Sequence, residues 1–405
     1  MYLKLAWRNI WRSGRRTAIT ISSIFFAVVF AILMRVMVVG LFDNMIANTV
    51  SLSCGYLQIH HAGYWDSKSI DSSFAENASL TQFLDHDKEI TAWAPRLESF
   101  ALASSGERTK GILVVGIDPR KENAVSNLMG KLTQGHYLQD SSKSILLGQG
   151  LAAYLHLHLN DTIILLGQGY QGNMAAGKYV IGGIIKLAVP DMNKTMAWLP
   201  MSRARDFLST GARYTSVSLM VKDRDQLLQL QRRVIAATKS SGYEVMTWKE
   251  MVPELDQLFQ AKMAQNEIMS GVLYLVIAFG IFGTIVMMVN ERMHEFGILI
   301  AIGMRKGILS AIVVTELLLM SVVGTLLGMA GAFPIVGYYR LHPIHMGGTW
   351  GAEAEQFNFE PVIQPSMAIS NFMIQGYIVL MMSITLSLYA IFKIYKMKAI
   401  AAINS

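Results

Sequence analysis

Glycines near residue 170 have the spacing of nucleotide-binding loops. Residues 167–172 match G-x-G-x-x-G, and residues 172–178 read G-N-M-A-A-G-K, which is close to a phosphate-binding loop. Both motifs bind phosphate where the amino terminus of a helix follows, because that end of a helix presents free N–H groups. Here a strand-like run, 179–185, follows, and Tyr179 stands where a magnesium-binding Ser or Thr is needed. We interpret the stretch as a flexible hairpin loop.

Histidines are the other side chains whose chemistry needs testing. Three close pairs occur, namely His60 with His61, His156 with His158, and His342 with His345. None is an H-x-x-x-H pair on a convincing helix, and no acidic triad accompanies them. The chain has one cysteine and no G-x-S-x-G nucleophile motif. We therefore predict no metal site, no cofactor and no catalytic residues in this chain.

Long apolar runs dominate the elements that surround these residues. Apolar residues make up 52% of the 405 and charged residues 16%, against about 25% charge in a typical soluble domain. Each of four runs exceeds the roughly 20 residues that a helix needs to cross a bilayer. We predict a membrane protein with transmembrane helices at 17–42, 268–290, 308–338 and 369–392, the third with a break near Pro334.

The distribution of charge predicts how these helices are oriented. Residues 1–16 carry a net charge of +5, residues 291–307 carry +1, and residues 393–405 carry +3. The positive-inside rule places these three segments in the cytoplasm. The segments 43–267 and 339–368 then lie outside. The net charge of +7 is accordingly a sign of membrane topology and lipid contact, and we predict no nucleic-acid partner.

The amino-terminal segment and the long external segment have distinct patterns. Basic and apolar residues alternate by helical spacing in residues 1–16, which predicts an amphipathic helix lying in the cytoplasmic interface. Segment 43–267 predicts an α+β domain, with residues 253–266 forming a helical stalk that continues into the second span. The predicted strands are Tyr56–Ile59, Ile112–Ile117, Ser144–Leu147, Thr162–Leu166, Tyr179–Ile185 and Ser216–Val221, and the predicted helices are Gln149–His156, Ser202–Thr210 and Asp225–Ser240.

The loop between the second and third spans carries the most specific pattern. Residues Asn290–Leu309 read NERMHEFGILIAIGMRKGIL. This resembles the signature loop of the FtsX/MacB family of ABC transporter permeases, roughly E-R-x-x-E-[IF]-G-[IL]-L-x-A-I-G-x-x-[KR]-x-I. Ile300 and His294 depart from it, because a basic residue is usual at both positions. The start Leu5–Thr20, the segments Val115–Pro119 and Gly148–Leu166, and the tail Lys396–Ile403, with Ala399 in place of proline, also resemble the family.

The resemblance implies a membrane subunit of a bacterial inner-membrane transporter. It implies that 291–307 is a coupling helix that receives movement from two cytoplasmic ATPase subunits, which hold ATP and magnesium, and that a second permease copy or homologue completes a dimer. Since this chain has no complete phosphate-binding loop, the ATPase is expected to be a separate polypeptide. The residues implied in coupling are Glu291, Arg292, Glu295, Gly297, Ala301, Gly303, Arg305 and Lys306.

Small and charged residues inside the spans predict further roles. Gly280 and Gly283, and Gly324 and Gly328, have the small size that permits close helix packing. Glu316 lies within the third span, where an acid is costly, so a role in packing or dimer gating is expected. Arg35 lies towards the outer side of the first span. It either extends to the lipid headgroups or meets an acidic substrate there.

Members of the family differ in the work they do outside the cell membrane. Lol permeases pass lipoproteins to a periplasmic carrier, MacB-type proteins export other amphiphiles or peptides, and FtsX-type proteins activate cell-wall hydrolases. The large external domain and the second outer loop favour lipoprotein release. A membrane sensor would need a larger cytoplasmic module. In the Lol case an opening for acyl chains is predicted along Phe25, Phe26, Val29, Leu33, Met37, Leu273, Ile277 and Ile281.

Overall fold

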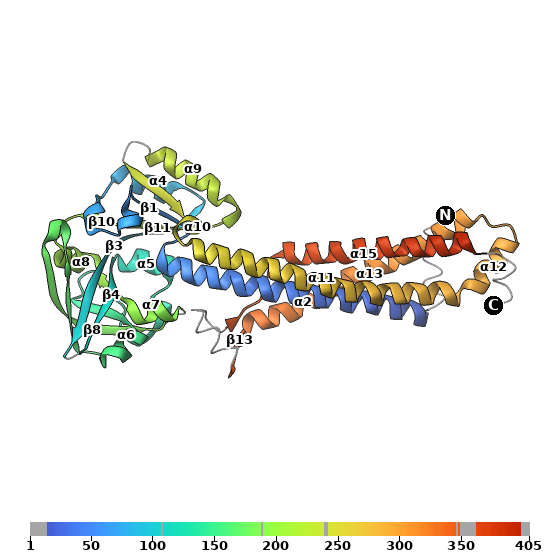
Figure 1. The fold of residues 1–405 in the computed structure, drawn as a ribbon, viewed down its shortest axis with the longest axis horizontal. Coiled ribbons are helices and arrows are strands. Elements are labelled where there is room, and N and C mark those ends of the chain that lie inside the picture. Colours follow the sequence, from blue (N-terminus) through green and yellow to red (C-terminus); the bar gives the residue numbers. More distant parts are fainter. Residues whose placement is uncertain are drawn as a thin grey trace. The chain divides into compact units, whose positions relative to one another are not determined.

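The computed structural model describes residues 14–106, 108–187, 189–238, 242–345, 347–348 and 362–397, and it divides into two compact units (Figure 1). One unit contains the apolar helices, and the other contains residues 44–258. The predicted amphipathic helix at 1–16 falls almost wholly outside the described residues, as does most of the predicted tail at 393–405.

Within the described residues, four helices are long and apolar enough to cross a membrane. They are α2 (Gly14–Ser53), α11 (Pro253–Glu291), α13 (Lys306–Leu341) and α15 (Ile369–Lys396). The predicted stalk at 253–266 is the first part of α11. The predicted break in the third span is wrong, because α13 continues through Pro334.

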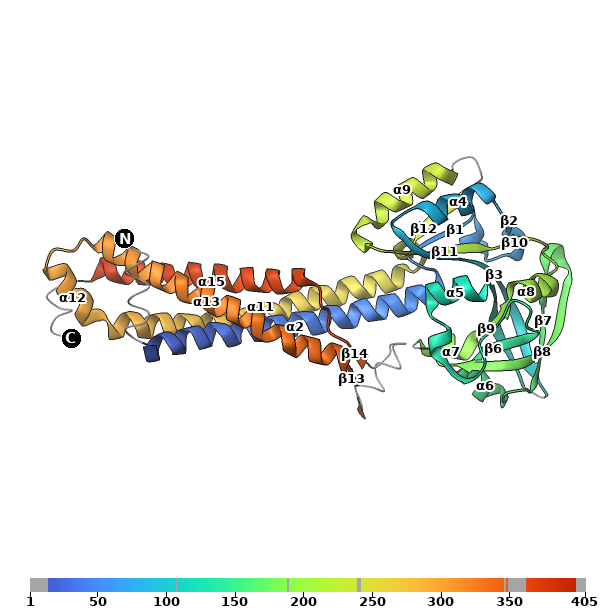
Figure 2. The ribbon, with the colours of Figure 1, turned by 180° about the vertical axis from the view of Figure 1, so that it is seen from behind.

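The apolar helices pack around a shared core in their unit. Ile24 and Ile32 of α2, Ile281 of α11 and Val336 of α13 are among its buried members. The helices α2 and α11 run side by side (Figures 1 and 2), and the Phe42 and Phe259 rings pack edge to face with centroids 5.6 Å apart. Two short strands, β13 (Ile344–His345) and β14 (Val362–Ile363), pair between α13 and α15.

The second unit is built on a twisted, mostly antiparallel sheet in the order β12-β1-β11-β3-β4-β9-β6-β8-β5, with β7 pairing both β3 and β8. Among the described strands, only the pairs β4 with β9 and β6 with β8 are parallel. The strands are β1 (Leu57–His61), β3 (Ile90–Ser105), β4 (Arg108–Ile117), β5 (Leu132–Gly135), β6 (Ser144–Gly148), β7 (Thr162–Gln168), β8 (Met174–Ile185), β9 (Met196–Pro200), β11 (Ser216–Val221) and β12 (Tyr243–Thr247), with β2 (Phe74–Ala75) and β10 (Arg213–Tyr214) forming a separate pair.

Helices lie against this sheet and bury their apolar faces on it. Leu151 and Leu155 of α6, and Phe207 and Leu208 of α8, enter the same core as Ile163 of β7. The helices are α3 (Tyr64–Ser67), α4 (Ala78–His86), α5 (Pro119–Ser126), α6 (Gln149–Leu155), α7 (Pro190–Thr195), α8 (Met201–Leu208), α9 (Leu227–Thr238) and α10 (Trp248–Met251).

The glycine-rich stretch near residue 170 is a hairpin, as predicted, but its loop is shorter than expected. Residues 174–178 belong to β8 and pair with β7, so that Gln168 faces Met174 and Leu166 faces Ala176. The turn between the strands is a single 3-10 turn at Tyr170–Gly172. Ala175 is buried in the core, and this burial extends the strand into the predicted loop. A strand, not a helix, follows the glycines.

Candidate functional site at the loop between the second and third spans

The loop between α11 and α13 contains a short helix, α12 (Met293–Ala301). Arg292 precedes it with non-helical backbone angles. At its other end the N–H of Met304 donates to the carbonyl of Leu299 at 3.0 Å. Gly303 has a φ of +103° there, which a side chain would strain. No atom lies within 4 Å of where its Cβ would be, so the space around Gly303 would admit a side chain. The positive φ is therefore the reason why this turn needs glycine.

Arg292 links this loop to the third span. Its Nη1 donates to Glu316 Oε2 at 2.6 Å, and its Nε donates to Glu295 Oε2 at 3.3 Å. The side chain of Arg292 is 11% exposed and that of Glu316 is 2% exposed. The guanidinium also lies 5.3 Å from the centroid of the Phe296 ring. The acid predicted to have a role in the third span thus has a cationic partner, as a buried charge requires.

Lys306 links the loop to the fourth span. Its Nζ donates to the backbone carbonyls of Tyr395 and Met397, at 2.9 and 2.7 Å. These carbonyls lie at the carboxyl end of α15, where a cation also interacts favourably with the helix dipole. Arg292 and Lys306 were both implied as contacts for an ATPase. Within the chain both side chains hold the loop on spans three and four, and their contact with an ATPase stays a prediction.

The outward face of the loop combines exposed apolar and charged side chains. Ile302 is 80% exposed and Ile298 is 40% exposed. Exposed residues from the predicted coupling set lie near them in sequence, namely Glu291, Glu295, Ala301, Gly303 and Arg305. Gly297 is buried beside Phe296. The structure thus separates the predicted set into an inner part that anchors the loop and an outer part that is exposed in this chain.

Two of the four predicted packing glycines lie at a helix contact. A Cβ on Gly324 would come within 2.9 Å of Ile24 Cβ, and one on Gly328 within 2.7 Å of Val28 Cβ. These glycines let α13 approach α2 closely. Gly280 and Gly283 on α11 are exposed, and no described atom lies within 4 Å of the place that a Cβ on either would take. Their packing role within this chain is not observed.

Arg35 has a partner inside the chain. It is half-buried, and its Nε donates to Asn371 Oδ1 at 3.3 Å. Asn371 lies at the start of α15 and is buried. A polar acceptor on a neighbouring helix is thus available to the side chain. Its extension to the headgroups, or its contact with an acidic substrate, stays a prediction. No pattern in the sequence signals this pairing, since the two residues are 336 positions apart.

Most of the residues predicted to line an opening for acyl chains pack in the core of the apolar helices in this chain. Val29, Ile277 and Ile281 are buried in the shared core, and Phe25, Leu33 and Leu273 pack against it. Met37 is half-buried, and Phe26 is 56% exposed. Lining of a substrate cavity by these residues remains a prediction.

Within the residues that the structure describes, no cluster of three or more His, Cys, Asp or Glu side chains is arranged to hold a metal ion. The three histidine pairs are not brought together with acids into such a cluster. His60 is buried against Tyr64 and Trp65, with ring centroids 5.7 and 6.2 Å away.

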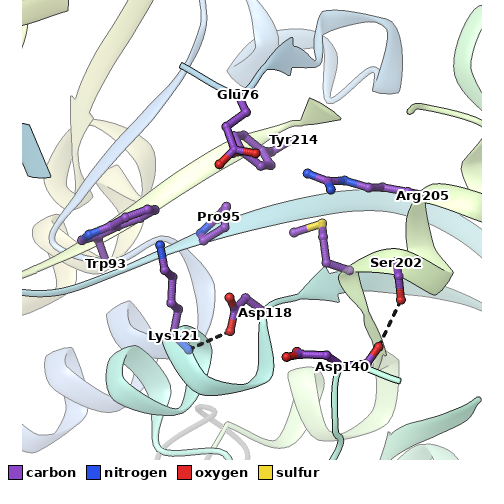
Figure 3. Close-up of a pocket in the computed structure, with 10 residues that line it drawn as sticks. Glu76, Trp93, Pro95, Asp118, Lys121, Asp140, Ser202, Arg205 and Tyr214 are labelled. Atoms are coloured by element: carbon purple, nitrogen blue, oxygen red, sulfur yellow. Dashed lines mark hydrogen bonds between the residues drawn. The ribbon is translucent and has the colours of Figure 1, made fainter. Parts of the chain in front are cut away.

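A cavity that the sequence did not suggest lies in the second unit (Figure 3). It measures about 260 Å³, and both cations and acids line it. Lys121 Nζ lies 3.3 Å from the centroid of the Trp93 ring, and the Arg205 guanidinium lies 5.5 Å from that of Tyr214. Asp118 is occupied in capping α5, where it accepts the backbone N–H groups of Arg120 and Lys121.

Four apolar helices, an α/β domain between the first and second, and an anchored helical loop between the second and third define a multi-pass membrane protein. Residues 17–237 match the model of the MacB-like periplasmic core domain, and residues 267–399 match that of the FtsX-like permease C-terminal domain. The chain belongs to the family of FtsX-like ABC transporter permeases with a MacB-like periplasmic domain, which are inner-membrane proteins.

Named relatives agree with this assignment. The lipoprotein-releasing system transmembrane protein LolC of Xylella fastidiosa (strain 9a5c) is 27% identical over 255 residues, which span 60% of each chain. LolC of Neisseria meningitidis serogroup B is 23% identical over 272 residues, or 64% of each chain. The chain thus matches somewhat under two thirds of the length of these relatives.

Solved structures resemble the chain more distantly. The periplasmic region of MacB from Actinobacillus actinomycetemcomitans matches with a TM-score of 0.35 and 16% identity, over 51% of this chain and 92% of that one. The extracellular domain of the transporter YknZ from Gram-positive bacteria matches with a TM-score of 0.35 and 14% identity, over 47% of this chain and 99% of that one.

Proposed function

We propose that this permease uses ATP hydrolysis by a separate cytoplasmic ATPase to release lipoproteins from the inner membrane. The observation that carries the proposal is the similarity to two LolC proteins, which are named as components of lipoprotein-releasing systems. The chain itself supplies no catalytic group to this reaction. ATP and magnesium are bound by the ATPase, and the permease contributes binding and movement.

The loop geometry supports a route from the ATPase to the spans. The outer face with Ile298 and Ile302 offers an apolar contact that a cytoplasmic protein can bury. Arg292 and Lys306 tie the same loop to α13 and α15. Movement imposed on α12 therefore reaches two spans directly. Two ATPase subunits and a second permease copy or homologue would complete the transporter, and a soluble periplasmic carrier would receive the lipoprotein.

Reconstitution tests the substrate. The permease and its ATPase are placed in proteoliposomes with a triacylated lipoprotein, and ATP-dependent transfer to a soluble carrier is measured. We expect transfer only with ATP and magnesium. If ATP is hydrolysed but no lipoprotein leaves the membrane, lipoprotein release is the wrong function. Export of another amphiphile, or activation of a cell-wall hydrolase, then becomes the hypothesis to test.

Substitution of Glu295 tests the loop. Glu295→Lys places a cation beside Arg292, which now contacts the Glu295 carboxylate, and it reverses the charge of the exposed face. We expect ATP hydrolysis to continue while the lipoprotein released per ATP falls about tenfold. A fall of this size corresponds to a typical coupling free energy between two sites. Glu254→Lys makes the same charge change at an exposed position at the start of α11 and should leave the ratio unchanged. An unchanged ratio in Glu295→Lys would remove this residue from the coupling route.

A further inference from the structure

The carboxyl end of α2 is capped by a buried arginine from the sheet. Arg96 of β3 donates from Nη2 to the carbonyl of Ser51 at 3.0 Å, and from Nη1 to those of Leu52 and Ser53 at 3.3 and 2.6 Å. The last carbonyls of a helix lack partners within the helix and form the negative end of its dipole. Arg96 satisfies three acceptors there with one cation.

Glu122 of α5 completes the arrangement. Its Oε2 accepts from Arg96 Nε at 3.0 Å, and its Oε1 accepts from Nη2 at 2.7 Å. Each of the five N–H donors of the arginine thus has an acceptor. The two side chains are 2% and 1% exposed, and Ser126 Oγ also donates to Glu122 at 2.7 Å. Lysine has three donors on a single nitrogen, so it cannot reproduce this pattern.

Arg96 lies on β3, which is in the middle of the sheet and joins its two halves. β3 pairs with β11 on one side and with β4 on the other, and its far end also pairs with β7. Arg96 itself faces Ser216 of β11 and Ile117 of β4. Glu122 lies on the helix that directly follows β4. A displacement of the end of α2 is therefore applied at the centre of the domain.

The start of α11 is held differently. Lys249 and Asp256 approach to 3.6 Å, and the side chain of Lys249 is 55% exposed. Val252, between α10 and α11, has φ −131° and ψ 66°, outside the helical region. The Val252 N–H donates to the Trp248 carbonyl at 2.9 Å, and the Leu255 N–H donates to the Val252 carbonyl at 3.1 Å, so α10 and α11 stay hydrogen-bonded to each other through this residue.

We propose that Arg96 and Glu122 form a rigid joint that passes movement of α2 to the sheet. Arg96 and Glu122 are then positioning residues for the transport cycle, and this role rests on the proposed function.

The test uses the full chain reconstituted with its ATPase. Arg96→Lys and Glu122→Gln should keep ATP hydrolysis within about twofold of the original and lower lipoprotein release per ATP about tenfold. Ile163→Ala is the matched control, because Ile163 is fully buried in the domain core on β7 and its loss destabilises the domain without touching the joint. A ratio that falls equally in Ile163→Ala would mean that the pair only stabilises the domain, and the proposal would be overturned.

Hydrogen exchange separates this proposal from the proposed function, because it needs no transport. In the detergent-solubilised full chain, the amides of Cys54 and Gly55 donate to the Val50 carbonyl at 3.1 and 2.7 Å. Arg96→Lys should speed their exchange about tenfold, as loss of a buried hydrogen-bond network does, and Ile163→Ala should not. Unchanged exchange in Arg96→Lys overturns the joint, even where lipoprotein release is observed. Faster exchange supports it, even where the substrate proves to be another molecule.

Discussion

At the scale of single residues, the two charged side chains predicted inside spans each have a polar partner within the chain. Glu316 meets Arg292, and Arg35 meets Asn371. The sequence identified Glu316 as costly inside a bilayer, it placed Arg35 towards the outer side of the first span, and it placed Arg292 in the signature loop. It did not show the pairings, because each joins helices that are adjacent only in the folded chain. Residue type shows that burying a charged side chain costs free energy. It does not show which residue of the folded chain will pair with that side chain and offset the cost.

The Arg292–Glu316 pair predicts a specific pattern of stability changes. Glu316→Leu leaves the Arg292 guanidinium with its buried acceptor removed, and Arg292→Met leaves the Glu316 carboxylate without its cation. Each single change should lower the unfolding free energy by about 3–5 kcal/mol, whereas the double variant should lose clearly less. Chemical denaturation of the purified protein in detergent measures this.

An exposed cation in the same loop provides the control for that series. Arg305→Met removes the same type of side chain at an exposed position before α13, so we expect a change within about 0.5 kcal/mol. If the double variant of Arg292 and Glu316 loses as much unfolding free energy as the two single variants together, the two side chains do not interact.

At the scale of elements, hydropathy located all four spans but underestimated the length of the first helix. α2 continues eleven residues beyond the predicted end at 42, to Ser53. Asp43, Asn44 and Asn48 end the apolar run, yet the helix continues because Met45, Ile46 and Val50 remain buried. Apolar run length reports contact with lipid, while helix length also depends on packing against protein.

The longest strand was missed for a related reason. β3 reads ITAWAPRLESFALASS and contains a proline and several Ala and Ser residues, a composition that is poor in β-branched side chains. Its strand conformation comes from pairing with three other strands. The six strands that were predicted are richer in Ile, Val and Leu. Arg96 was missed with the strand, since its acceptors come from α2 and α5.

The contact between α13 and α2 predicts opposite effects for two glycines on one helix. Gly328→Ala would place a Cβ 2.7 Å from Val28 Cβ, and such overpacking typically costs about 1–3 kcal/mol. Gly337→Ala meets no atom within 4 Å and should stabilise α13 by roughly 0.5–1 kcal/mol through helix propensity. Thermal unfolding in detergent compares the two. Equal and small effects would show that α2 and α13 do not approach this closely in the native protein.

At the scale of the whole molecule, hydropathy predicted the number and order of the spans. The order of helices and the domain between the first two are confirmed by the structure and by the matches to the MacB-like and FtsX-like domains. The orientation remains a prediction from the positive-inside rule. It matters for mechanism, because the loop at 291–307 reaches an ATPase only if that loop is cytoplasmic.

Cysteine labelling tests the orientation directly. Cys54 is the single cysteine and is buried. Cys54→Ala removes it, so this background has no thiol that a maleimide can label. Met174→Cys and Ile302→Cys then introduce a thiol at positions where the present side chains are 87% and 80% exposed. In spheroplasts, a membrane-impermeant maleimide should label Met174→Cys at once and Ile302→Cys only after lysis, because the positive segments retain the loop inside. Labelling of both before lysis, or the reverse order, would contradict the predicted orientation and the coupling role of the loop with it.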